Sequence, residues 1–154
     1  MGSKLRPPKR KNGVVRPAHR RDAVEIYGDL RPDDLMEIEA LGLCPMKAIL
    51  SSVDVSEKCY TIWVEDKPVG IFGIARAADE LPTGYPWLMG TPGIMDVGWQ
   101  FLRESRKWLE ELADGFDLLT NIVHEDNELS VKWLRFLGMQ FIERKPPFLE
   151  FAKI

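Results

Sequence analysis

The stretch HEDNELSVKWLRFLGMQ, residues 124–140, has the pattern of a capped amphipathic helix that follows a strand. Asn127 belongs to the residue types favoured at a helix N-cap, and Gly138 to the type favoured just past the last turn. The sequence therefore predicts a helix over residues 127–138. Three leucines are expected to bury its inner face: Leu129, Leu134 and Leu137.

The segments around this helix predict an α/β fold. Residues 116–123 are apolar enough for a buried strand, and residues 99–113 carry apolar side chains at the spacings of an amphipathic helix. Further strands are predicted at 13–16, 59–64, 68–75, 85–90, 139–144 and 148–153, and helices at 31–41 and 46–51, whereas 20–27 could be strand or helix. Hairpins alternating with helical crossovers predict a mixed twisted sheet of six to seven strands with helices on both faces. Pro86 is expected at a strand start or a sheet edge.

Length and cysteine content narrow the class of protein. A chain of 154 residues favours a single domain, and it contains no apolar run long enough to span a membrane. Two cysteines, Cys44 and Cys59, are too few for a disulfide framework. We therefore expect two reduced structural thiols in a cytoplasmic protein.

Charge divides the chain into a basic arm, residues 1–13, and a folded domain, residues 14–154. The first 22 residues carry eight Lys or Arg and one Asp, so with a total charge of −3 the remainder carries −10. The arm could bind phosphate, nucleic acid or an acidic partner surface. It could equally be a solvated tail or fold back on the acidic domain. The residues expected to make any such contact are Lys4, Arg6, Lys9, Arg10 and Lys11.

The order of elements, together with Asn127-x-x-Ser130 and the run Trp133-Leu-Arg-Phe-Leu-Gly-Met139, resembles the GNAT family of N-acetyltransferases. The resemblance implies that strands 85–90 and 116–123 are parallel and splay apart to admit acetyl-CoA. The pantetheine arm would then lie along the edge of the first of these strands. The residues implied as cofactor contacts are Leu88, Met89, Gly90, Gly93, Gly98, Arg103 and Asn127.

Two features depart from the family pattern. The loop 91–98, which would hold the pyrophosphate, contains Pro92, which has no N–H, and Asp96, which is negative. An alternative is that this loop only caps the following helix, with Asp96 as N-cap. The second departure is Leu134, which stands where the family often has a tyrosine that serves as general acid.

Few residues near the expected cleft could act as a general base. His124 and Glu125 follow the strand 116–123 and are the candidates, His124 because its ordinary pKa is near neutral. The alternative is a polar turn that precedes the N-cap. Trp87, Trp99 and Trp133 also lie around the expected cleft, where they could fill it, contact a protein or pack in the core.

Two functions follow from the resemblance. The chain is similar to small GNAT-like proteins of short-tailed bacteriophages, which implies a degenerate acetyl-CoA site and a virion assembly or internal virion role. That role places the protein in the host cytoplasm or the virion, with virion proteins as partners. The alternative is an active N-acetyltransferase acting on an amine of a small molecule or protein. Bound acetyl-CoA and no cofactor are both compatible with the sequence, and no metal is expected.

Overall fold

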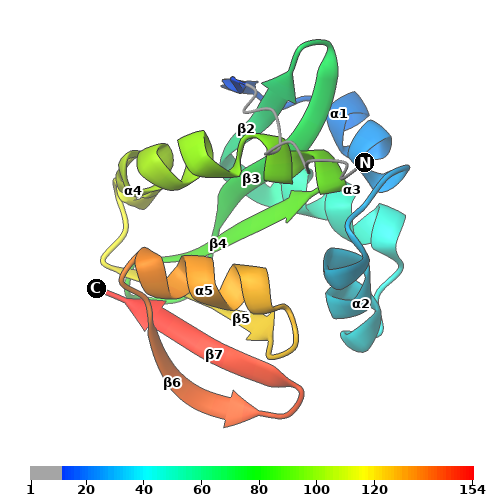
Figure 1. Cartoon of the computed structure of the whole chain (residues 1–154). Coiled ribbons are helices and arrows are strands. Elements are labelled where there is room, and N and C mark those ends of the chain that lie inside the picture. The colour runs from blue at the N-terminus through cyan, green and yellow to red at the C-terminus, as the bar shows by residue number, and fades with distance from the viewer. Residues whose placement is uncertain (1–11) are drawn as a thin grey trace, which may run out of the picture.

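The computed structural model describes residues 12–154 (Figure 1), so the five basic residues of the predicted arm lie outside the described part of the chain. The elements follow in the order β1 (Val14–Pro17), α1 (Arg20–Tyr27), α2 (Pro32–Ala40), α3 (Pro45–Val55), β2 (Ser56–Val64), β3 (Lys67–Arg76), β4 (Thr83–Gly90), η1 (Pro92–Asp96), α4 (Gly98–Ala113), β5 (Leu118–His124), α5 (Glu128–Phe136), β6 (Gln140–Lys145) and β7 (Phe148–Lys153).

The seven strands form one mixed sheet in the order β1-β2-β3-β4-β5-β7-β6. The pair β4–β5 is parallel, and each of the other neighbouring pairs is antiparallel. Helices α4 and α5 cover one face of the sheet, and α1, α2 and α3 cover the other (Figure 1). The predicted α/β class, the mixed sheet and the helices on both faces are confirmed.

Tertiary packing decides the elements that the local pattern left open. Residues 20–27 are helix α1, which buries Ala23 and Ile26 completely against α3 and β3. Helix α3 is longer than predicted and continues to Val55. The predicted helix stop at Gly138 is confirmed by its positive φ angle (86°), the conformation that glycine adopts without strain. Gly42 (73°) after α2 and Gly115 (91°) after α4 have the same conformation.

Strands β4 and β5 separate soon after they begin. Their parallel ladder contains two residue pairs, Thr83–Leu118 and Gly84–Leu119. This confirms the predicted splay. Pro86 was expected at a strand start or an edge, but it lies inside β4, where the ladder to β5 has already ended. A missing N–H on that side of β4 therefore removes no strand-to-strand hydrogen bond.

The predicted N-cap position of Asn127 is confirmed, although its side chain makes no capping hydrogen bond and donates to two carboxyl groups of α2. Two other expectations for helix ends and faces were wrong. Leu129 is 40% exposed, whereas Leu134 and Leu137 are buried as predicted. Asp96 does not cap α4, because it ends the η1 turn and Val97 takes the N-cap position.

Of the helices within residues 12–154, none is long and apolar enough to cross a membrane.

Candidate functional site

A cavity of about 570 Å³ lies at the gap between β4 and β5. Its walls come from both faces of the sheet, because α2 and α3 contribute on one side and α4 and α5 on the other. The lining is mostly apolar and includes Leu88, Phe101, Trp133 and Leu134. Glu37 is one of its few ionisable side chains. A large, mostly apolar cavity with a few polar groups is the usual form of a small-molecule site.

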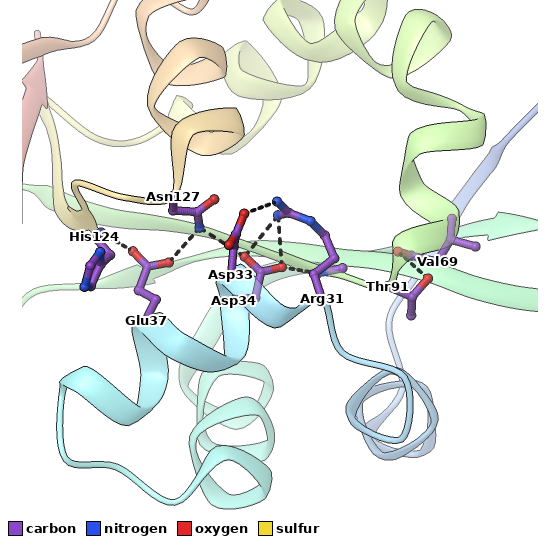
Figure 2. Close-up of polar contacts among 9 residues, drawn as sticks. Arg31, Asp33, Asp34, Glu37, Val69, Thr91, His124 and Asn127 are labelled. Atoms are coloured by element: carbon purple, nitrogen blue, oxygen red, sulfur yellow. Dashed lines mark hydrogen bonds and ion pairs between the residues drawn. The ribbon is translucent and has the colours of Figure 1, made fainter. Parts of the chain in front are cut away.

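Two carboxyl groups of α2 join the separated ends of β4 and β5 (Figure 2). Asp34 Oδ2 accepts the Gly90 N–H at 3.0 Å, and Glu37 Oε1 accepts the His124 N–H at 2.7 Å. Asn127 Nδ2 donates to Asp34 Oδ1 and to Glu37 Oε2, each at 3.3 Å. We call Asp34, Glu37 and Asn127 the acid bridge. It ties the C-terminal ends of both splayed strands and the start of α5 to one helix.

Burial changes the ionisation of both acids in the bridge. Burial raises the pKa of Asp34, although Arg31, whose Nη1 lies 3.2 Å from Asp34 Oδ1, opposes this rise. Burial likewise raises the pKa of Glu37 to about 7, and the charge of Asp34 adds to the effect. The hydrogen bonds from His124 N–H and the Asn127 amide partly offset the rise. A carboxyl group with this pKa exchanges its proton near neutral pH, as a general base must.

The predicted bases lie at the end of β5 but engage other partners. The His124 side chain is buried, its Nδ1 accepts the Asp126 N–H at 3.1 Å, and its ring packs on Phe148 at 5.7 Å. Glu125 Oε2 lies 2.6 Å from Arg144 Nε, and this pairing lowers the pKa of Glu125. These contacts agree with the alternative interpretation of a polar turn before α5.

The predicted cofactor contacts on β4 differ in their availability. Leu88 and Met89 line the cavity. Both backbone groups of Gly90 are already hydrogen-bonded. The N–H of Arg31, the residue before α2, donates to the Gly90 carbonyl at 2.8 Å, and Asp34 of α2 accepts from the Gly90 N–H. Strand residues alternate in direction, so Leu88 faces the same edge as Gly90. Leu88 is therefore the β4 residue best placed to bond a ligand along this edge.

The loop after β4 uses backbone donors internally. Gly93 N–H donates to Thr91 Oγ1 at 3.2 Å, and Ile94 N–H donates to the Thr91 carbonyl at 3.0 Å. Helix α4 begins at Gly98 without a side-chain cap, and open space surrounds the Gly98 Cα. Arg103 is exposed one turn further along. The start of α4 is therefore better suited to an anion than the loop itself.

Asp34 and Glu37 were not predicted as site residues, because the segment that contains them was predicted only as a helix over residues 31–41. One signal was available, since Asp34 lies four residues before Ile38 and both are buried, which puts a carboxylate on the apolar stripe of α2. Among the described residues, no group of three or more His, Cys, Asp or Glu side chains is arranged to hold a metal ion.

Solved structures share the overall fold of this chain. The chain has the GNAT fold. Similar structures include a GNAT-family acetyltransferase from Bacillus anthracis (TM-score 0.63, 14% identity, 95% of this chain and 96% of that chain), ribosomal-protein-S5-alanine acetyltransferase from Vibrio fischeri (0.59, 15%, 92% and 92%) and PaiA N-acetyltransferase from Thermoplasma acidophilum in complex with coenzyme A (0.62, 12%, 92% and 98%). No protein-family model and no curated protein sequence matches the chain. At these identities the likeness establishes the fold alone.

Proposed function

We propose that the cleft binds the acyl-pantetheine arm of acyl-CoA and that the protein transfers the acyl group to an amine, with Glu37 as proton acceptor. One observation carries this proposal: Glu37 lines the cavity, and burial raises its pKa to about 7. Two features support this ligand: the walls of the cavity are mostly apolar, as a pantetheine arm requires, and the Leu88 edge offers backbone hydrogen bonds. Bound acyl-CoA supplies an acyl group activated as a thioester.

The residues of the chain divide the remaining work. Glu37 takes a proton from the ammonium group of the acceptor, which leaves a nucleophilic neutral amine. His124 N–H and the Asn127 amide each bond one carboxylate oxygen of Glu37 and so hold it in place. The uncapped start of α4 at Gly98 would face the pyrophosphate.

The test combines binding with turnover. Calorimetric titration with acetyl-CoA should give a dissociation constant below about 100 µM, within the range usual for enzyme substrates. Release of free thiol in the presence of a panel of amines should rise with pH through about 7, following the pKa of Glu37. Glu37→Gln should lower this rate by roughly 100-fold or more. Glu39→Gln, an exposed change on the same helix, is the matched control. An unchanged rate in Glu37→Gln would refute the role of this residue.

A second candidate function is binding to a partner protein, without acetyl-CoA and without acyl transfer, and three observations favour it. Asp34 and Arg31 already engage the backbone of Gly90, Pro92 offers no N–H, and Leu134 offers no hydroxyl. This function includes the degenerate donor site and the virion assembly or internal virion role, which the sequence resemblance supports. It requires that acetyl-CoA neither binds below about 1 mM, the upper end of common substrate constants, nor raises the melting temperature.

A further inference from the structure

Trp133 lines the cavity and carries a hydrogen-bond donor that the described residues leave unpaired. It lies on α5, it lines the cavity beside Leu134, and its ring packs against Phe101 of α4 with 5.4 Å between the ring centroids. Its indole Nε1 is buried and has no hydrogen-bond partner among residues 12–154. Buried side-chain donors in native proteins are nearly always paired, so an unpaired donor calls for an acceptor that the described residues do not supply.

Trp87 provides a comparison, because its indole N–H is hydrogen-bonded within the protein. Trp87 also borders the cavity, and its Nε1 donates to Ser56 Oγ at 2.8 Å. The donor of Trp87 is therefore satisfied within the protein, whereas no described residue accepts from the donor of Trp133. A leucine or phenylalanine at position 133 would fill the apolar wall without leaving a buried N–H unpaired.

The indole of Trp133 is the hydrogen-bonding group at this point of α5, because the next residue, Leu134, has none on its side chain. Leu134 is buried and apolar, so α5 has no hydroxyl at that position. An indole N–H donates a hydrogen bond but does not ionise in the accessible pH range. It can hold an acceptor oxygen in place, but it cannot protonate a leaving group.

We infer that Trp133 is a positioning residue whose indole N–H bonds a carbonyl oxygen of the acyl-pantetheine arm, either an amide or the thioester. This inference rests on the proposed function. In a mostly apolar cavity, a single donor of fixed direction orients a long ligand, because the ligand has few other polar contacts there. The donor thereby sets how far the ligand enters the cleft.

The first test uses the wild-type protein labelled with ¹⁵N. The chain contains five tryptophans, whose indole N–H resonances are assigned without any variant. On addition of acetyl-CoA, the Trp133 resonance should move downfield, as expected for a donor that gains a carbonyl acceptor. The Trp63 resonance should stay in place, because Trp63 does not line the cavity. This readout does not depend on a substituted protein folding.

The second test measures affinity. Trp133→Phe keeps an aromatic ring and removes the N–H, so the dissociation constant for acetyl-CoA should increase roughly 3- to 10-fold. Trp63→Phe removes an indole outside the cavity and should change it less than about twofold.

The outcomes separate the inference from the function on which it rests. If wild type does not bind acetyl-CoA, the proposed function and the inference both fail. If wild type binds while the Trp133 resonance does not move downfield, only the inference fails. Equal affinity of Trp133→Phe and wild type would overturn the inference in the same way.

Discussion

Replacing Glu37 by Gln should make the protein relatively more stable as the pH rises. The folded state holds the Glu37 proton up to a pKa of about 7, whereas the ordinary value is 4.5. Between these values the folded state binds more protons than the unfolded state, so the wild type loses stability as the pH increases. Glutamine does not ionise, so the variant avoids this loss.

The magnitude follows from the two pKa values. At about 1.4 kcal/mol per pKa unit, the wild type should lose at most about 2.5 kcal/mol between pH 5 and pH 8 from this group. Glu37 is half-buried, so solvent screening reduces the effect, and we expect about 1–2.5 kcal/mol. The substitution also disturbs the bond from Asn127, but this offset is much the same at each pH.

The assay is urea unfolding at pH 5, 6, 7 and 8, and the quantity compared is the difference in unfolding free energy between variant and wild type. That difference should shift in favour of Glu37→Gln through this range. Glu125→Gln is the control. Because Arg144 lowers the pKa of Glu125, the pH dependence that this substitution removes should lie below pH 4.5, outside the measured range. A difference for Glu37→Gln that stays constant from pH 5 to pH 8 would show that burial does not keep Glu37 protonated in this range.

Three further perturbations test the bridge, the core and the arm. Asn127→Ala removes a donor that lowers the pKa of both Asp34 and Glu37, so the pH-dependent loss of stability should continue to a higher pH than in the wild type in the same urea series. Leu134→Ala truncates a buried side chain and should reduce the unfolding free energy by about 2–4 kcal/mol, measured by denaturant titration. Deleting residues 2–11 should leave the melting temperature unchanged, and it should abolish binding to duplex DNA whose log K falls with log salt with a slope of roughly −4 to −5.

The fold could be predicted because most of its signals are local. Hairpin strands, helix periodicity and stop glycines such as Gly138 each depend on a few neighbouring residues, and the structure confirms them. Residues 20–27 could not be assigned, since an eight-residue segment carries too few apolar positions to separate helix from strand. Its conformation depends on α3 and β3, against which α1 packs.

The candidate site could not be predicted in the same way, because its contacts are distant in sequence. Asp34 meets Gly90 across 56 positions and Asn127 across 93. Near Asp34 itself, the sequence shows acids in the first turn of a helix, which the helix dipole already accounts for. The spacing of Asp34 to Ile38 is the one further signal, and it does not reveal the partners of Asp34. The residues near the end of β5 attracted attention as bases because histidine titrates near neutral pH. Burial gives Glu37 that property instead.

The edge of β4 that faces the gap determines where a ligand can form backbone hydrogen bonds. Pro86, Leu88 and Gly90 face the gap, and their availability to a ligand differs. The carbonyl of Pro86 accepts from Asn121 Nδ2 at 2.9 Å, and Gly90 is bonded to Arg31 and Asp34. A ligand that bonds only at Leu88 leaves the acid bridge intact, whereas one that also bonds at Gly90 must displace a buried carboxylate. Displacing that carboxylate opposes binding, because a buried charge that loses its hydrogen-bond partners is strongly destabilising. The cleft therefore favours ligands that bond β4 at Leu88 and leave Gly90 with its partners from α2.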